Sequence, residues 1–194
     1  MKPFDSTQRR REALAALLTD PVEEVRIAVA DALESLEGMG NLPEILDTLK
    51  KGDLGTKIKA LYALGKIGGE EVVPALLYCA TRPEEDIRSV AVEILGRLAV
   101  PRALPIIVER LKDQNPGIQA KAIAALGNFN DPSVVALLLP FLDAGDGLLD
   151  AEAVMSLARV GKANLETKFI DLLRSPHPQT REAAALALAK LPVR

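Results

Sequence analysis

The chain repeats itself every 31 residues, and this period constrains its fold more than any other feature. The step is clearest in one column of leucines that stays in register without any insertion: Leu33, Leu64, Leu95, Leu126, Leu157 and Leu188. A fixed period of this length is the signature of a repeat architecture, in which each unit buries its apolar face against its neighbours. The leucine column therefore predicts six such units within the 194 residues.

The residues around the leucine column have the spacing of an amphipathic helix. The column four residues earlier is apolar in every unit: Val29, Ala60, Ala91, Ala122, Ala153 and Ala184. Apolar positions separated by four and seven residues lie on one face of a helix. A shorter apolar stripe precedes this helix in each unit, and turn residues such as Asp20-Pro21 and Asn115-Pro116 separate the two. Each unit is therefore predicted to be helix, turn, helix.

The predicted fold is an all-α solenoid, a superhelix of six 31-residue hairpins with twelve helices, no strands and all six column leucines buried. The composition agrees, because 48% of the residues are apolar, aromatics make up 3% and Trp is absent, as in a core of closely packed helices. A lead-in of residues 1–6 precedes a single domain of residues 7–194. The predicted repeats are residues 7–37, 38–68, 69–99, 100–130, 131–161 and 162–192.

A family resemblance rests on short motifs within each unit. They are an apolar-Arg pair, an Ala-Leu-Gly triplet and an Ile-Gly pair, as in Val25-Arg26, Ile87-Arg88, Ala63-Leu64-Gly65, Ala125-Leu126-Gly127 and Ile67-Gly68. The pattern resembles the HEAT-like repeats of phycobilin lyase subunits and many other bacterial proteins, over about residues 7 to 191. The resemblance implies stacked hairpins whose second helices line the concave side of a crescent. Glu34, Gln119 and Asp150 depart from it, so the first and fifth repeats are the least typical.

A basic column stands at the start of the predicted second helices, at Arg26, Lys57, Arg88 and Arg181. Positive charge at a helix N-terminus opposes the macrodipole, so something must offset it. Acidic turn residues such as Asp20 and Asp113 are near in sequence. We expect a structural ladder of Asp–Arg contacts between hairpins rather than a binding site.

The residue inventory argues against catalysis. His177 is the one histidine and lies in a Ser-Pro-His-Pro turn, where a solvated side chain is the simplest expectation. Cys79 is the one cysteine, at a first-helix position that predicts inert packing. Catalysis needs a nucleophile, base or metal held in geometry, and the chain lacks the repeated His-Glu pairs of di-iron HEAT-like hydroxylases. We expect no catalytic residue, no cofactor and no metal, and hence no enzyme.

Two surfaces of the second helices are candidates for binding. The first is the outward, concave face, predicted to bind a partner through Ile27, Asp31, Ile58, Tyr62, Glu93, Met155 and Leu186. Partial burial of these side chains between neighbouring helices is an equally open interpretation. The second is a basic edge made of Lys59, Lys66, Arg97, Lys121, Arg159 and Lys190. Solubility and favourable charge at helix C-termini could also explain this edge.

The leading functional hypothesis is a non-catalytic protein-interaction scaffold that binds another protein on its concave face. One alternative, implied by the resemblance alone, is a lyase or chaperone subunit that acts on a bilin or tetrapyrrole protein. Another is binding of a polyanion or nucleic acid along the basic edge. The formal charge of -3 and the absence of Trp argue against nucleic acid.

The two ends of the chain carry the remaining expectations. The N-terminal sequence has no apolar signal region and no stretch is apolar enough for a membrane span, so we expect a cytoplasmic protein without membrane contact. The last helix, over residues 183–189, is apolar nearly all round. A terminal repeat normally has a polar outer side, so this repeat is a candidate for self-association.

Overall fold

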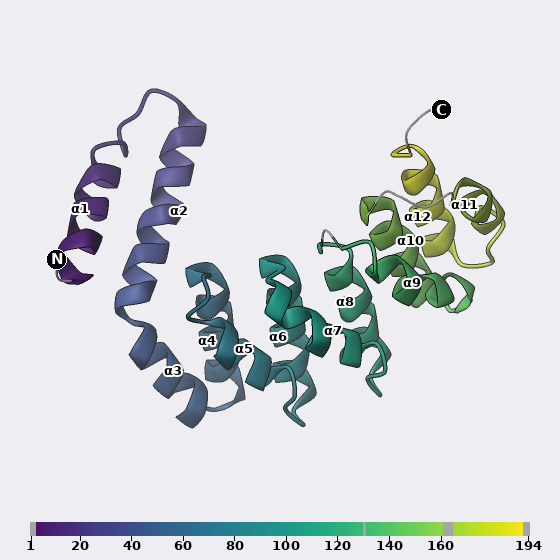
Figure 1. Cartoon of the computed structure of the whole chain (residues 1–194), viewed down its shortest axis with the longest axis horizontal. Helices are drawn as coiled ribbons and strands as arrows, with labels where there is room; N and C mark the ends of the chain where they lie inside the picture. The colour runs from purple at the N-terminus through teal and green to yellow at the C-terminus, as the bar shows by residue number, and fades with distance from the viewer. Residues whose placement is uncertain (1–2, 130, 161–164, 192–194) are drawn as a thin grey trace. The chain divides into compact units, whose positions relative to one another are not determined.

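The computed structural model describes residues 3–129, 131–160 and 165–191. Within these ranges the chain forms twelve α-helices and two short 3-10 helices, with no strand, which confirms the all-α prediction. The helices follow one another as hairpins (Figure 1). The predicted repeat ends at residues 130, 161, 162 and 192 lie outside the described residues.

The helices alternate between a first and a second member of each hairpin. The first members are α1 (Pro3–Ala15), α3 (Leu42–Lys51), α5 (Val73–Cys79), α7 (Leu104–Arg110), α9 (Val134–Leu138) and α11 (Glu166–Leu172). The second members are α2 (Glu23–Gly40), α4 (Leu54–Ile67), α6 (Glu85–Leu98), α8 (Pro116–Leu126), α10 (Leu149–Val160) and α12 (Pro178–Leu188). The 3-10 helices η1 (Pro101–Ala103) and η2 (Leu139–Asp143) precede α7 and follow α9. The helix α1 begins at Pro3, within the predicted lead-in.

Turn residues set where the second helices begin. The Asp53 side chain accepts a hydrogen bond from the Thr56 amide at 2.8 Å, and the Asn115 side chain accepts one from the Gly117 amide at 2.8 Å. These bonds satisfy amides that have no partner inside the helix. Pro116 and Pro178 open α8 and α12, where a missing N–H costs nothing.

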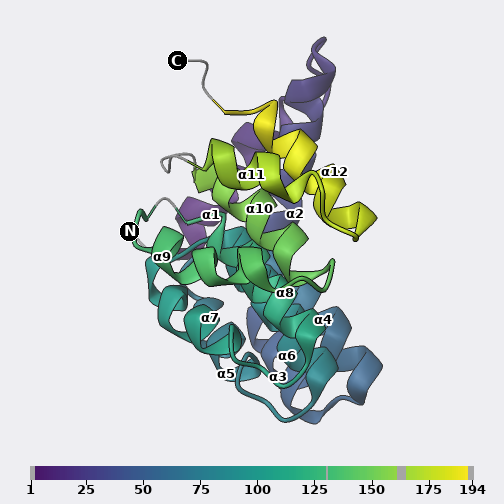
Figure 2. The same ribbon diagram turned by 90° about the vertical axis from the view of Figure 1, so that its right-hand side faces the viewer.

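The chain divides into two compact units, residues 1–75 and residues 76–194. In the first unit α1 packs against α2, and α4 packs against both α2 and α3. In the second unit the second helices α6, α8, α10 and α12 pack successively in a row (Figure 1). The first helices α7 and α9 lie on one side of that row (Figure 2). The single domain predicted from the unbroken period stays a prediction.

The two units differ in how much core they bury. Of the described apolar residues that are buried, six lie in the first unit and thirty in the second. Among the residues of α1, α2 and α3 whose burial the structure describes, Val29 alone is buried, and no residue of α3 is buried. Most of the burial that stabilises the fold therefore lies in the second unit.

The leucine column is buried in the middle of the chain and not at its ends. Leu64, Leu95, Leu126 and Leu157 are 0 to 2% exposed, whereas Leu33 and Leu188 are half-buried. The prediction that all six leucines are buried is therefore wrong for the first and last repeats, because each of these has a neighbouring repeat on one side only. The column of smaller residues, from Val29 to Ala184, is buried in all six repeats.

In the part of the chain that the structure describes, no helix combines the length and the apolar character needed to cross a membrane.

Candidate functional site

The predicted partner-binding residues of the first unit lie on the outward surfaces of α2 and α4. Ile27 is 55% exposed, Tyr62 is 41% exposed and Asp31 is also exposed, whereas Ile58 is half-buried. Large apolar side chains in water are unfavourable individually, although single ones are common on protein surfaces. Here Ile27 and Tyr62 come from neighbouring helices that pack against each other.

In the second unit the side chains predicted to face outward differ in their exposure. Glu93 and Leu186 are exposed, the latter by 48%, while Met155 is half-buried. The residue that corresponds to Ile27 in the fourth repeat, Ala120, is 6% exposed. Partial burial between helices thus applies to the Ile27 column in the interior of the stack. The accessible face runs instead along the columns that begin with Asp31 and Ser35.

Three residues of the predicted basic edge meet at one cavity in the second unit. A hollow of about 210 Å³ lies between α6, α8 and α10, and its lining includes Arg97, Lys121, Arg159, Glu93 and Asn128. We call it the basic pocket. Its lining therefore combines residues of the basic edge with Glu93 of the predicted partner face. These residues were predicted to belong to two separate surfaces.

The cations of the basic pocket differ in how they are partnered. Lys121 Nζ lies 2.7 Å from Glu93 Oε2. The Arg159 guanidinium donates to Asn128 Oδ1 at 3.0 Å, to the Ala124 carbonyl at 3.1 Å and to Ser156 Oγ at 3.0 Å. Arg97 is exposed and forms no hydrogen bond or ion pair with any described residue. As far as the described residues show, the pocket therefore holds one neutralised cation, one fixed cation and one free cation.

Glycines bring these side chains together by letting the second helices approach closely. A Cβ added to Gly96 would lie 2.7 Å from Cα of Ala125, and one added to Gly127 would lie 2.8 Å from Cα of Ser156. Both distances are shorter than packed carbons allow. The close approach also lets the Asn128 amide donate to the Gly96 carbonyl at 3.0 Å, which satisfies a carbonyl at the end of α6.

The other three residues of the basic edge lie outside the pocket. In the first unit Lys59 is exposed, and Lys66 Nζ lies 2.7 Å from Glu34 Oε1. In the second unit Lys190 is exposed just after α12. Asn128 was missed as a member because it is uncharged, although its place in the same column as Lys66 and Arg97 could have identified it.

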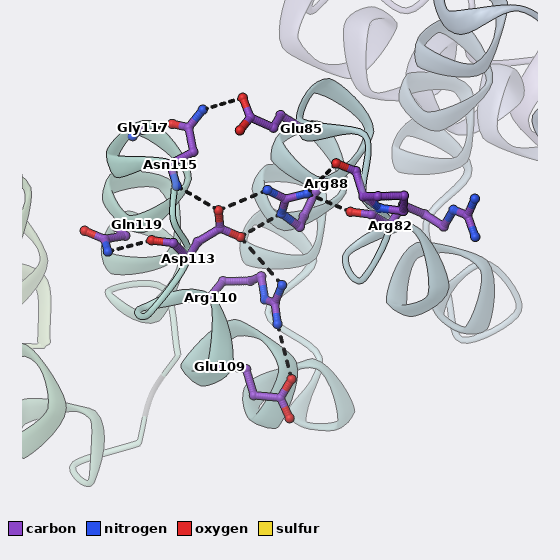
Figure 3. Close-up of polar contacts among 10 residues, drawn as sticks. Arg82, Glu85, Arg88, Glu109, Arg110, Asp113, Asn115, Gly117 and Gln119 are labelled. Atoms are coloured by element: carbon purple, nitrogen blue, oxygen red, sulfur yellow. Dashed lines mark hydrogen bonds and ion pairs between the residues drawn. The ribbon is translucent and has the colours of Figure 1, made fainter.

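The expected Asp–Arg contact between hairpins is present at Arg88 (Figure 3). Arg88 Nε donates to Asp113 Oδ2 at 2.7 Å and Nη2 donates to Asp113 Oδ1 at 3.0 Å, so the pair is bidentate. Arg88 is 8% exposed and Asp113 is 7% exposed. Burial alone would raise the pKa of Asp113, but hydrogen bonds from Arg88 and from the Asn115 amide hold that pKa below its usual value.

Elsewhere in this column the contacts are to the backbone of the preceding turn. Arg26 donates to the Asp20 and Pro21 carbonyls at 2.6 and 3.2 Å, and Arg181 donates to the Ser175 and Pro176 carbonyls at 2.8 and 3.0 Å. Arg88 makes the equivalent bonds to Arg82 and Pro83 in addition to its ion pair. The column closes the turn of its own hairpin, and Lys57 is half-buried at the corresponding position.

Glu152 lies half-buried on α10, one helical turn before Ser156. Burial raises the pKa of its carboxyl, and the positive charge of Arg159 offsets this in part. The folded chain therefore binds the Glu152 proton more tightly than the unfolded chain does. Stability is consequently lost as the pH rises from the ordinary value of 4.5 through the folded pKa.

We predict that Glu152→Gln stabilises the protein at pH 7, because it removes a charge that burial disfavours. The gain should disappear below pH 4.5, where wild type carries the proton in both states. Urea denaturation of both proteins at pH 7 and pH 4 measures the two differences. Equal stability at pH 7 would show that the carboxylate is adequately solvated.

The single histidine and the single cysteine have structural surroundings. His177 is half-buried, and its Nε2 lies 2.9 Å from the Gly145 carbonyl oxygen, so the ring closes a contact between two turns rather than facing water alone. Cys79 is 3% exposed. Among the described residues no three His, Cys, Asp or Glu side chains are grouped closely enough to hold a metal ion.

The first unit has an apolar hollow that no sequence pattern indicated. It measures about 480 Å³ between α1, α2 and the end of α4, and Leu14, Leu36, Met39 and Ile67 contribute to its lining. The hollow exists because α1 and α2 bury few of their apolar side chains, which leaves Met39 42% exposed.

Comparisons with known proteins place the architecture among repeat proteins. The chain is similar to one subunit structure in the complex of CpcE and CpcF of phycocyanin lyase from Nostoc sp. PCC7120, at 20% identity and a TM-score of 0.64, over 77% of this chain and 98% of that chain. It is similar to an engineered protein at 20% identity and a TM-score of 0.55, over 93% and 95% of the two chains. A designed armadillo repeat protein matches at 16% identity and a TM-score of 0.53, over 93% and 99%.

At these identities the structural matches show the fold alone. Comparison with curated protein sequences gives no significant match. The family model for HEAT repeats matches residues 11–93 and 73–158, which together span most of the chain. The periodic sequence, the stacked hairpins and this match agree, and the chain belongs to the HEAT repeat family.

Proposed function

We propose that this chain is a non-catalytic scaffold that binds another protein along the outward face of its second helices. The observation that carries the proposal is the contrast between two kinds of column. The inner column from Val29 to Ala184 is small, apolar and buried in every repeat, whereas the outward column changes from Asp31 to Tyr62 to Glu93, and these three side chains and Leu186 are exposed. Exposed side chains that vary from one repeated helix to the next are suited to recognising a partner.

Apolar exposure favours a protein partner over a purely charged one. Ile27, Tyr62 and Leu186 are each more than 40% exposed on second helices, and Tyr is among the residues enriched in protein interfaces. A solved protein of this fold, from the CpcE and CpcF complex, is itself part of a protein–protein assembly. A lyase or chaperone role on bilin proteins gains no residue-level support from that likeness, because it is a likeness of fold.

The C-terminal repeat remains a predicted self-association surface. In α12 the residues Ala183, Ala184 and Ala187 are buried and Leu186 is exposed, so the outer side offers one large apolar side chain rather than a continuous patch. The partner proposed on the second-helix face is a different protein, and self-association through the C-terminal repeat stays a separate prediction.

The test compares the two faces of the hairpins. The partner is first captured with tagged chain from the native host, identified by mass spectrometry and purified. Calorimetry then compares wild type with the triple variant Ile27→Ala, Tyr62→Ala and Leu186→Ala, and with a control pair on first helices, Glu44→Lys and Glu109→Lys. We expect the triple variant to weaken binding at least about tenfold, because exposed anchors supply most interface energy. Weakening by the control pair and not by the triple variant would refute the assignment.

A further inference from the structure

We propose that the basic pocket between α6, α8 and α10 binds a carboxylate-rich segment of a protein partner. The inference rests on the proposed function and names the chemistry that one part of the outward face recognises. Three cations, Arg97, Lys121 and Arg159, line the pocket, and Glu93 is the one carboxylate among its lining residues. The pocket therefore carries an excess of positive charge, although the chain as a whole carries a formal charge of -3.

Arg97 is the basic side chain of the pocket that is available to bind a ligand. Its guanidinium is exposed at the end of α6 and has no hydrogen-bond or ion-pair partner among the described residues. A planar guanidinium presents donors in a fork that matches a carboxylate in two parallel bonds. Placed beside a second guanidinium, it gives a partner's Asp or Glu side chain an anchor in this pocket.

Arg159 is already held in position for the same task. Its three bonds to Asn128, Ala124 and Ser156 use three of its five N–H donors, which leaves two for a ligand. A side chain that is fixed before binding loses little conformational entropy when the ligand arrives. The close helix contacts at Gly96 and Gly127 hold the backbone that carries this arrangement.

Glu93 is a carboxylate within the pocket that competes with an acidic ligand for Lys121. Its carboxylate lies 2.7 Å from Lys121 Nζ, the geometry that an incoming acidic side chain would take on the same lysine. An acidic ligand must therefore displace Glu93 from Lys121 or bind despite its charge. Removing that charge should strengthen binding, which is an effect that no loss of folding can imitate.

The surroundings favour an acidic peptide over a nucleic acid. A hollow of about 210 Å³ accommodates one or two carboxylate side chains. No aromatic residue lines it, so bases have no stacking platform there, and single-stranded nucleic acids are bound largely by such stacking. Of the basic edge in the second unit, Lys190 alone lies outside the pocket, just after α12.

The experiment measures binding of a fluorescein-labelled hexaglutamate peptide to the full chain by fluorescence anisotropy at low salt. Four variants are compared with wild type: Arg97→Gln, Arg159→Gln, Glu93→Gln and the control Lys66→Gln, a basic-edge residue of the first unit. We expect Arg97→Gln and Arg159→Gln to weaken binding about fivefold or more, Glu93→Gln to tighten it about threefold or more, and Lys66→Gln to change it by less than about twofold. A hexalysine peptide should not bind.

Three outcomes would overturn the proposal. One is the absence of hexaglutamate binding to wild type, and another is binding that Arg97→Gln and Glu93→Gln leave unchanged. The third is tighter binding of a twelve-residue oligothymidine with the same dependence on Arg97, which would assign the pocket to nucleic acid. None of these results alters the comparison of Ile27, Tyr62 and Leu186 with the first-helix face, so failure of the pocket is distinguishable from failure of the scaffold proposal.

Discussion

Replacing Arg88 by Ala is expected to lower the free energy of unfolding by about 3–5 kcal/mol, the cost of breaking a buried ion pair from one side. The substitution leaves Asp113 almost fully buried without its two guanidinium bonds of 2.7 and 3.0 Å, so that Arg110 Nη1, 3.6 Å from Asp113 Oδ2, is the cation that remains beside it. It also frees the carbonyls of Arg82 and Pro83, which lose their donor. Urea denaturation followed by circular dichroism measures the loss.

The chain offers a matched control for this prediction at Arg181. This residue occupies the same column and makes the same pair of backbone contacts, to the Ser175 and Pro176 carbonyls, but it is exposed and forms no ion pair with a carboxylate of any described residue. Arg181→Ala should therefore cost about 0.5–1.5 kcal/mol, the net value of ordinary hydrogen bonds. Equal losses for Arg88→Ala and Arg181→Ala would mean that the ion pair adds nothing to turn closure.

The pH dependence of the same variant gives an independent measurement. Hydrogen bonds from Arg88 help to lower the pKa of Asp113 in the folded chain, so wild type gains stability from this pair above the ordinary value of 3.8 and loses it as the pH falls below. Arg88→Ala removes that contribution. The difference in stability between wild type and Arg88→Ala should therefore be largest near neutral pH and narrow in acid.

The fold was predictable because the 31-residue step and helical spacing act together on every repeat. The alternation of a small buried column with a leucine column can be satisfied in one way, by stacking second helices against one another. The degree of burial was not predictable at the ends. Leu33 and Leu188 occupy the same column as Leu126, but in this chain each lies in a repeat that has a neighbour on one side, and the apolar periodicity does not record that difference.

The columns of the sequence predicted which basic residues belong to the candidate site, but not which side chains contact one another. The column pattern predicted Arg97, Lys121 and Arg159, but Glu93 was assigned to another surface and Asn128 was omitted. Which side chains meet depends on how closely α6, α8 and α10 approach, and that distance follows from Gly96 and Gly127. A glycine in a helix can reflect close packing or merely tolerance, so the spacing of letters alone does not determine the separation.

The small number of buried residues in the first unit could also not be predicted from the sequence. Its hairpins carry the same apolar periodicity as the others, yet α3 has no buried residue and α2 has Val29 alone. Periodicity states which face of a helix is apolar and leaves open how much of it is covered. Coverage depends on helix length and placement, as the long α2 shows.

Leu126→Ala should destabilise the protein by about 2–5 kcal/mol, because it deletes three carbons from a side chain that is fully enclosed. Leu126 is 0% exposed at the end of α8, where α8 packs against α6, α7 and α10. The cost combines the lost transfer of apolar surface with the cavity that rigid neighbouring helices leave unfilled. Denaturant unfolding of the full chain measures it.

Leu188→Ala is the control for that measurement, since it makes the same chemical change in the same column of the same unit. Leu188 is half-buried at the end of α12, so the truncated site is open to water and leaves no enclosed cavity. We expect a loss of about 1 kcal/mol there, the transfer cost of the area that is covered. A loss below about 1 kcal/mol for Leu126→Ala, or one no greater than that for Leu188→Ala, would show that the leucine column does not form the centre of the stack.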